Sequence, residues 1–214
     1  MNTTYRVAKL QPGDKEQFIE AFLSAFRNDP LIVHAFGHER SGDPATDRRI
    51  RAFLGFLFDK GMLLDEPLWG IYDGTTLLGG YIAEGTADQP SSGGWAKQLR
   101  LSWRMLALAR HIPMQALRFL SDYSRMTRAV VPVLQHRYLT MIAVRREAQG
   151  CGLGKKLLLH VLRTAEEVGM GVALDTENPD NVPLYEHFGF KLIKEIRVDG
   201  VTVYCMFCDT SAVS

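Results

Sequence analysis

The sequence predicts an α/β fold built around a mixed sheet. The last third of the chain carries this prediction, because stretches with strand character alternate there with amphipathic helical stretches. Such alternation favours a sheet in which some strands pair in parallel. The apolar fraction of 46% is typical of a globular chain that can bury a core without disulfides. The chain contains no apolar run of about 18 residues, so we expect no membrane-spanning helix.

The N-terminal part shows strand, helix and hairpin patterns in turn. Phe18, Phe22 and Phe26 recur at helical spacing, and Asn28-Asp29-Pro30 is expected to end that helix. Asp73-Gly74 favours a tight hairpin turn between two strands. The predicted elements are a strand over Tyr5–Leu10, helices over Glu16–Phe26 and about Thr46–Leu63, and strands over Leu68–Tyr72 and Thr76–Glu84.

A loose stretch rich in Gly, Ser and Pro, Gly85–Gly94, separates these elements from a second helical region. That region runs from Trp95 to about Val131 and is interrupted at Pro113. The remainder alternates regularly between strands and helices. We expect strands over His136–Val144, Val172–Thr176, near Phe190–Arg197 and over Val201–Cys208, and helices over Gly152–Val168 and Asn181–Phe188.

The charges are nearly balanced, which argues against a nucleic-acid partner. Lys plus Arg is 25 and Asp plus Glu is 24, so the formal net charge is +1, whereas nucleic-acid binding usually needs a strong positive excess. A basic run nevertheless follows Trp95. It could attract an anionic substrate or cofactor phosphates, but the solvated face of two amphipathic helices is the favoured interpretation. Its members are Lys97, Arg100, Arg104, Arg110, Arg118, Arg125 and Arg128, against the single acid Asp122.

The three cysteines, Cys151, Cys205 and Cys208, are too few and too unevenly placed for a secreted disulfide framework. Cys205 and Cys208 form one Cys-x-x-Cys within a predicted strand, where residues three apart point to opposite faces. We therefore expect structural thiols and no metal site. The start of the chain has no apolar signal core, so the expected location is the cytoplasm.

The strongest local signal is the glycine-rich turn Gln149-Gly150-Cys151-Gly152-Leu153-Gly154, between a predicted strand and a predicted helix. Such a turn exposes backbone N–H groups at a helix start, where the helix dipole adds partial positive charge. Glycine also lets the backbone approach an anion closely. The pattern therefore predicts a phosphate site, with Lys155 and Lys156 at its rim.

The glycine spacing excludes two familiar phosphate motifs. Gly150-x-Gly152-x-Gly154 lacks the two residues that precede the last glycine of a dinucleotide fingerprint. A P-loop requires Gly-Lys followed by Ser or Thr, whereas Lys156 follows Gly154-Lys155 here. A plain tight turn explains the glycines about as well, so the turn alone does not identify a ligand.

Two longer stretches resemble the GCN5-related N-acetyltransferase (GNAT) family. Ile142–Gly154 is similar to its acetyl-CoA motif, a strand, a short turn and Gln/Arg-x-x-Gly-x-Gly/Ala. Asn178–Phe190 is similar to its Asn-x-x-Asn-x-x-x-Tyr-x-x-x-Gly-Phe segment. The similarity is clear over about residues 136–208. The resemblance implies the GNAT fold, a single domain over 1–214 whose sheet of about six or seven strands is mixed and splayed, with helices on both faces.

Within the family, the chain resembles the puromycin-acetyltransferase-like branch. His136–Leu139, Leu174–Thr176 and an early Phe26-x-x-Asp29-Pro30 carry this finer resemblance. One departure is Arg146, where many members have proline; we expect it to alter only the turn.

The resemblance also implies where acetyl-CoA, the expected cosubstrate, would bind. The pantetheine arm would pair with the strand that contains Ile142, Ala143 and Val144, an N–H there would stabilise the oxyanion, and the pyrophosphate would lie on the glycine-rich turn. The expected cofactor-binding residues are Ile142, Ala143, Val144, Gln149, Gly150, Cys151, Gly152, Leu153, Gly154, Lys155, Asn181 and Tyr185.

Tyr185 is the expected general acid for the departing CoA thiolate. The alternative is that Tyr185 only packs beside Phe188. Asp175 is the expected general base, but Glu177, Glu84 and His136 remain open, as does a water chain. Cys151 lies in the turn and is expected to point away from the thioester, so we expect direct attack by the amine.

The predicted reaction is acetyl transfer from acetyl-CoA to a primary amine, and the branch resemblance favours a small molecule. The helical regions 16–63 and 95–131 would shape the acceptor pocket. The alternatives are a protein or peptide N-acetyltransferase and a non-catalytic CoA-binding sensor. A nucleotide-dependent oxidoreductase is the least favoured function, because the glycine spacing does not match its fingerprint. Neither a nucleic acid nor a membrane is expected as a partner. A homodimer stays open, because homodimers are common in the family.

Overall fold

Seven strands form one mixed sheet in the order β1-β2-β3-β4-β5-β7-β6. The structure is a computed structural model that describes residues 5–37, 43–85 and 95–210. Every neighbouring pair is antiparallel except β4 and β5, which run parallel. The strands are β1 (Arg6–Lys9), β2 (Leu68–Asp73), β3 (Thr76–Glu84), β4 (His136–Val144), β5 (Gly171–Thr176), β6 (Lys191–Val198) and β7 (Val201–Cys208). The predicted mixed α/β sheet of six or seven strands is confirmed.

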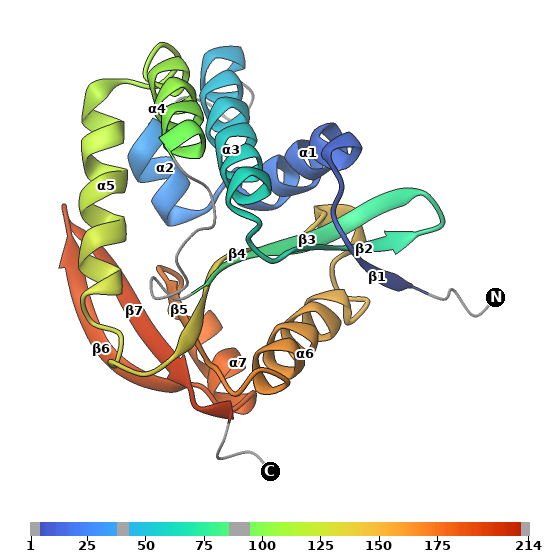
Figure 1. Cartoon of the computed structure of the whole chain (residues 1–214). Coiled ribbons are helices and arrows are strands. Elements are labelled where there is room, and N and C mark those ends of the chain that lie inside the picture. The colour runs from blue at the N-terminus through green and yellow to red at the C-terminus, as the bar shows by residue number, and fades with distance from the viewer. Residues whose placement is uncertain (1–4, 38–42, 86–94, 211–214) are drawn as a thin grey trace.

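Helices cover both faces of this sheet, as the resemblance implies (Figure 1). One face carries α1 to α5 and the other carries α6 and α7. The helices are α1 (Lys15–Phe26), α2 (Pro30–Phe36), α3 (Pro44–Leu64), α4 (Trp95–Leu108), α5 (Met114–Arg128), α6 (Leu153–Glu166) and α7 (Asn181–His187), with 3-10 turns η1 (Pro12–Asp14) and η2 (Arg146–Ala148). The predicted loose segment lies, except for Gly85, outside the described residues.

Helix α2 is an element that the sequence analysis missed. Asn28-Asp29-Pro30 does end α1, but it also begins the next helix. The Asp29 carboxylate accepts hydrogen bonds from the N–H groups of Leu31 and Ile32, at 3.0 and 3.3 Å. Pro30 occupies the first helical position, where a missing N–H costs nothing. The same residues are therefore a stop signal and a start signal.

Two apolar cores lie on opposite faces of the sheet. Phe18, Phe22 and Phe58 pack between α1, α3 and the sheet. Leu157 and Val161 of α6 pack on the other face. A smaller apolar cluster near α5 and the β6–β7 hairpin contains Cys205, whereas Cys208 belongs to the α6 core. Both thiols are buried and free. Because the two clusters lie on different faces, the expected places of the thiols on opposite faces are confirmed.

The parallel strands β4 and β5 separate part-way along their length. Their pairing runs from His136↔Gly171 to Leu139↔Leu174 and is not continued beyond. On its other side β4 stays paired with β3 as far as Val144. The second half of β4 therefore has one paired edge and one edge that no strand of the described residues covers. This is the splay that the resemblance implied at the centre of the sheet.

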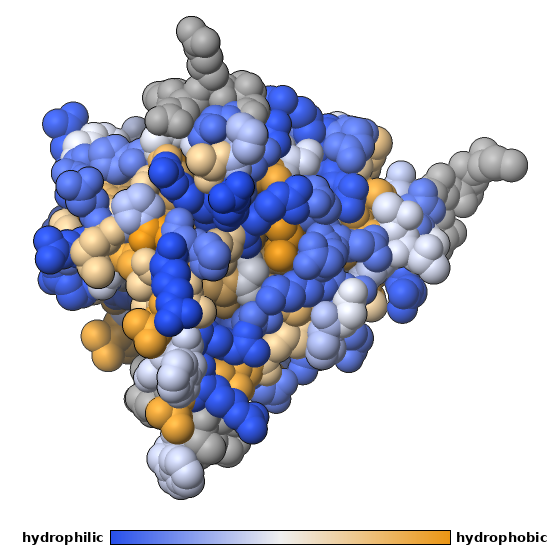
Figure 2. Space-filling model, turned by 90° about the horizontal axis from the view of Figure 1, so that it is seen from above, coloured by the Kyte–Doolittle hydropathy of each residue, from blue (hydrophilic) through white to orange (hydrophobic). Residues whose placement is uncertain are grey.

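The outer surface of the helical layer is mostly hydrophilic, with separate apolar patches between the polar side chains (Figure 2). Trp95 and Trp103 of α4 are 82% and 64% exposed, so part of this helix presents large apolar groups to solvent. Among the described residues, no helix is both long and apolar enough to cross a bilayer.

Candidate active site

The glycine-rich turn has the geometry of an anion site at the start of α6. Gly150 and Gly152 adopt φ values of +79° and +74°, which L side chains rarely tolerate. Gly152 caps α6, and the first helical hydrogen bond to it runs from the Lys156 N–H, at 3.1 Å. The N–H groups of Leu153 and Gly154 therefore precede the helical hydrogen bonds and are open to a ligand.

Side chains around the turn hold its backbone in place. The Gln149 amide donates to the Val144 carbonyl at 3.1 Å, which closes the strand end onto the turn. The Arg146 N–H donates to the Ser24 hydroxyl of α1 at 3.2 Å, a contact that a proline at this position could not make. The departure at Arg146 thus adds a link between η2 and α1 and leaves the glycines unchanged.

The uncovered edge of β4 presents backbone groups of Ile142 and Val144. The Arg145 N–H donates to the Leu78 carbonyl of β3 at 2.8 Å. Because successive residues of a strand direct their backbone groups to opposite sides, Val144 and Ile142 direct theirs away from β3. Ala143 is opposite Gly80 in the β3 ladder, so its backbone groups point toward β3. The expected pairing with an extended ligand therefore falls to Ile142 and Val144, and Ala143 lies between them.

A cavity of about 540 Å³ opens at this splay. Thr140, Met141 and Ile142 of β4 line it, together with the end of β5 and with Asn181 and Tyr185 of α7. Helices α1 to α5 supply most of the remaining wall, mainly with apolar side chains. Among the residues described, the buried Thr140 Oγ1 has no hydrogen-bond partner. Residues from the two predicted acceptor regions and from the predicted cofactor core thus meet around one space.

Two carboxyl groups share one phenol at the end of β5. The Tyr123 hydroxyl contacts both Asp175 and Glu177, and the Tyr138 hydroxyl contacts the other oxygen of Asp175. A phenol has one hydrogen and can donate it once. If Tyr123 donates to Asp175, Glu177 must itself carry a proton and donate to the Tyr123 oxygen. The geometry therefore favours one proton held within Asp175–Tyr123–Glu177.

Burial and mutual repulsion agree with this proton count. Burial raises the pKa of Glu177 to about 8, and the charge of Asp175 adds to the shift. Burial also raises the pKa of Asp175, although hydrogen bonds from Tyr123 and Tyr138 act in the opposite direction. Because Asp175 receives two phenol donors, we assign it the ionised form and Glu177 the proton. Such a pair exchanges a proton near neutral pH.

Tyr185 and Asn181 lie on α7, facing the same cavity. Burial raises the pKa of Tyr185 to about 12, with further contributions from the charges of Asp175 and Glu177. The phenol therefore keeps its hydrogen at physiological pH, and within the described chain no other group hydrogen-bonds to it. The Asn181 amide donates to the Thr176 hydroxyl at 3.2 Å. The packing alternative for Tyr185 also has support, since its ring meets Phe190 edge-on at 5.7 Å.

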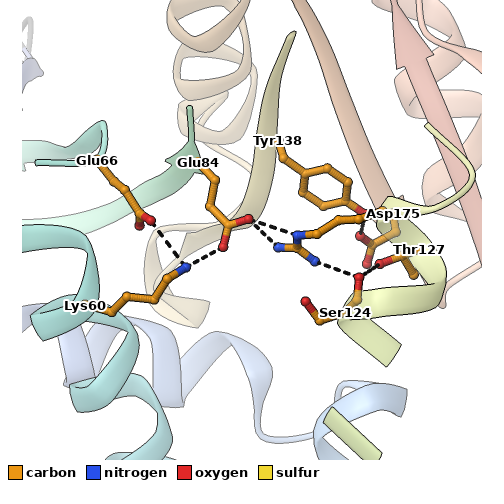
Figure 3. A network of polar contacts seen from close by, with 8 residues as sticks. Lys60, Glu66, Glu84, Ser124, Thr127, Tyr138 and Asp175 are labelled. Atoms are coloured by element: carbon orange, nitrogen blue, oxygen red, sulfur yellow. Dashed lines mark hydrogen bonds and ion pairs between the residues drawn. The ribbon is translucent and has the colours of Figure 1, made fainter. Parts of the chain in front are cut away.

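An ion-pair network borders the cavity (Figure 3). The Lys60 ammonium lies between Glu66 and Glu84, with its Nζ 3.3 and 2.5 Å from their carboxylate oxygens. The Arg128 guanidinium binds the second oxygen of Glu84 at 2.6 and 2.9 Å. Arg128 also lies over the Tyr138 ring, 4.3 Å from its centroid.

This network corrects the interpretation of the basic run for Arg128. It is not a solvated surface residue, because Glu84 and the Tyr138 ring hold it against the sheet. Burial raises the pKa of Glu84, but Lys60 and Arg128 outweigh burial and hold it below its ordinary value. Arg104 is likewise ion-paired, with Asp59.

Three of the four predicted base candidates line the cavity, and their settings differ. Glu84 is engaged by two cations, which makes it a poor proton acceptor. His136 does not line the cavity, and its Nδ1 lies 2.6 Å from the Leu134 carbonyl. Asp175 and Glu177 remain, joined through a residue that the sequence analysis did not select, Tyr123. Only its place in the basic helical region, not its own pattern, could have drawn attention to it.

The remaining predicted residue, Cys151, is exposed in the turn, as is Lys155. Cys151 does not line the cavity. Its position therefore agrees with the expectation that it takes no part in the chemistry, while its cofactor contact stays a prediction.

Comparison with known proteins agrees with this geometry. Residues 118–190, which include both motifs and the whole of β4, β5, α6 and α7, match the model of the Acetyltransferase (GNAT) family. The fold is that of the GNAT acetyltransferases.

Solved acetyltransferase structures match over nearly the full length. A histone acetyltransferase HPA2 and related acetyltransferase from Corynebacterium glutamicum is 19% identical with a TM-score of 0.70, and 95% of each chain is covered. Arylalkylamine N-acetyltransferase 2 from Aedes aegypti is 13% identical with a TM-score of 0.63, covering 95% of this chain and 97% of that one. PaiA N-acetyltransferase from Thermoplasma acidophilum, in complex with coenzyme A, is 15% identical with a TM-score of 0.54, covering 96% and 99%.

These similarities establish the fold and leave the acceptor open. One of the three proteins is named for a histone and another for an arylalkylamine. The puromycin-acetyltransferase-like branch is not singled out among the matches, so that finer resemblance stays a prediction. The acceptor must be argued from the cavity itself.

Proposed function

We propose that this chain transfers an acetyl group from acetyl-CoA to a primary amine of a small molecule. One observation carries the proposal. The cavity opens on the uncovered edge of β4, beside Tyr185 and the Asp175–Tyr123–Glu177 trio. A thioester held along that edge would meet an acceptor in the cavity next to a proton donor and a proton acceptor.

The residues present fit acetyl-CoA. The open N–H groups at the start of α6 suit its pyrophosphate, and the exposed Lys155 and Lys156 add positive charge nearby. The backbone groups of Ile142 and the N–H of Val144 suit the amides of its pantetheine arm, while the Val144 carbonyl already accepts the Gln149 amide. Thr140 Oγ1 offers a further polar group without a partner in the described chain. These are roles that we assign to the predicted cofactor residues.

The trio and Tyr185 divide the proton transfers of a direct attack. An acceptor ammonium first loses a proton to the Asp175–Tyr123–Glu177 trio, in which Asp175 is ionised. The free amine nitrogen then attacks the thioester carbonyl carbon, and an N–H on the open edge of β4 stabilises the oxyanion. As the C–S bond breaks, Tyr185 gives its proton to the departing thiolate. The attacking nitrogen loses its second proton in the same collapse, and that proton restores the Tyr185 phenol, so that an amide and neutral CoA thiol remain. Its raised pKa makes Tyr185 a weak acid, so its action depends on close placement.

The shape of the cavity favours a small acceptor over a protein. Helices α3, α4 and α5 supply apolar side chains over the space, and a polypeptide would have to extend past them. A non-catalytic CoA-binding sensor remains the alternative. It is disfavoured because a sensor has no need for a proton-sharing trio beside the thioester position.

Calorimetric titration with acetyl-CoA tests the proposal. Gly152→Glu places a carboxylate in the phosphate turn, whereas Gly169→Glu is a matched control at the other end of α6. Both glycines have positive φ, +74° and +68°, and open space around the α-carbon. Both variants therefore carry similar backbone strain.

We expect wild type and Gly169→Glu to bind acetyl-CoA and Gly152→Glu to lose binding through charge and bulk. Equal binding by all three proteins would overturn the assigned phosphate site. No binding by wild type would overturn the proposed function.

A further inference from the structure

The cavity has a charged part and an apolar part. Asp29, Asp175 and Glu177 gather where α2 begins and β5 ends. Burial raises the pKa of both Asp29 and Glu177, and the charge of Asp175 adds to both shifts. The helices supply a different lining. Phe53 and Leu57 come from α3, Met105 and Leu108 from α4, and Leu117 and Leu120 from α5.

The cations that line the cavity do not offset this acidic part. Lys60 and Arg128 both bind Glu84, whose two oxygens are divided between them. Their charges are therefore met within the network of Figure 3. The charge left facing the cavity is negative and lies at Asp29 and the Asp175–Tyr123–Glu177 trio. A cation is the complementary ligand for that part.

The number of cations that the cavity can accept is limited. Asp175 and Glu177 hold one proton between them, and the Asp29 carboxylate already accepts two backbone N–H groups. The Asp29 carboxylate is thus already engaged at the start of α2. The trio itself carries one net negative charge, which one ammonium group neutralises. A second ammonium of the same molecule would lie among Leu and Phe side chains, where it would lose its hydration and find no counter-charge.

We propose that the acceptor is a lipophilic primary monoamine, with its ammonium group at the Asp175–Tyr123–Glu177 trio and an uncharged alkyl or aryl body under α3, α4 and α5. This inference rests on the proposed acetyl transfer and deepens it. Polyamines and aminoglycosides carry several ammonium groups and are excluded as preferred acceptors. A peptide is also excluded, because its polar backbone would lose its hydration in the apolar part of the cavity.

Octylamine and 1,8-diaminooctane are a matched test pair, because they share a chain length and differ by one terminal ammonium. The rate of CoA release is measured with each amine at saturating acetyl-CoA. We expect kcat/KM for octylamine to exceed that for the diamine at least about 10-fold, since the diamine must bury an unpaired charge.

A variant pair checks where the apolar body lies. Met105 lines the cavity and is 46% exposed, while Met114, 58% exposed, does not line it. Because both side chains are exposed, a charge at either position is not expected to unfold the protein. Met105→Glu should reduce the octylamine preference several-fold by offering a counter-charge to the diamine. Met114→Glu should leave the preference as in wild type.

Three outcomes overturn the inference while leaving acetyl-CoA binding intact. They are equal use of the two amines, faster use of a short peptide with a free amino terminus, and no acetylation of octylamine. If acetyl-CoA itself does not bind, the proposed function fails, and calorimetric titration with the two amines alone then decides the inference. Tighter binding of octylamine supports the monoamine cavity, and equal or weaker binding refutes it.

Discussion

Glu84 is the residue on which the ion-pair network depends. Its carboxylate is the common partner of Lys60 and Arg128, and it links β3 with α3 and α5 at the cavity wall. Glu84→Gln keeps the shape and one acceptor oxygen but removes the charge. Lys60 and Arg128 then face each other without their shared counter-charge, and Lys60 keeps only Glu66, at 3.3 Å.

The expected loss of stability can be worked from burial. Removing one partner of a fully buried ion pair costs about 3–5 kcal/mol. The side chains of Lys60, Glu84 and Arg128 retain 22%, 19% and 32% exposure, so water relieves part of the penalty. The glutamine oxygen also still accepts one hydrogen bond. We therefore expect a loss of about 2–3 kcal/mol, which corresponds to a fall in Tm of about 4–12 °C for a chain of this size.

Urea denaturation at pH 7 measures this loss, with Glu195→Gln as the matched control. Glu195 is exposed on β6, and its substitution should change the free energy of unfolding by no more than about 0.5 kcal/mol. A loss for Glu84→Gln no larger than that of the control would refute the reasoning. It would mean that solvent, and not Glu84, satisfies the two cations.

Three further predictions concern the catalytic groups. The folded state holds a proton on Glu177 between its ordinary pKa of 4.5 and its raised pKa of about 8, so the free energy of unfolding should fall as pH rises through this window. Denaturation across pH 5–8 should show a flatter dependence of this free energy on pH for Glu177→Gln, and an unchanged slope would contradict the shared proton. Tyr185→Phe should lower kcat about 100-fold with little change in KM for acetyl-CoA, and a wild-type kcat would leave Tyr185 a packing residue. Cys151→Ser should retain kcat within about twofold; loss of activity, or an acetyl-enzyme seen by mass spectrometry, would contradict direct attack.

Local patterns predicted the fold well in the last third of the chain. The strands at 136–144 and 201–208 lie where their apolar patterns indicate, because each is flanked by a clear turn or helix start. Helix α2 was missed for a physical reason. Asp29 and Pro30 suit the end of one helix and the start of the next equally well, and a helix of seven residues has too few apolar positions to show a period.

The site residues fall into two groups, those that sequence motifs located and those that only the structure brings together. The glycine-rich turn and the α7 residues Asn181 and Tyr185 are contiguous in sequence, so motifs located them. The cavity wall is assembled from helices far apart in the chain, and nothing in the sequence pairs Tyr123 with Asp175. Arg128 was read as a surface residue because a helical period does not reveal that Glu84, 44 residues earlier, meets it. Choosing among the four base candidates also required their three-dimensional surroundings.

Hydrogen exchange with and without acetyl-CoA tests the central claim most directly, since it reports on backbone N–H groups. The account predicts slower exchange in two places at once, at Ile142 and Val144 on the open edge of β4 and at Leu153–Lys155 at the start of α6. The β6–β7 hairpin, Lys191–Cys208, should exchange as before. Protection confined to that hairpin, or no protection at either predicted place despite bound acetyl-CoA, would contradict the account.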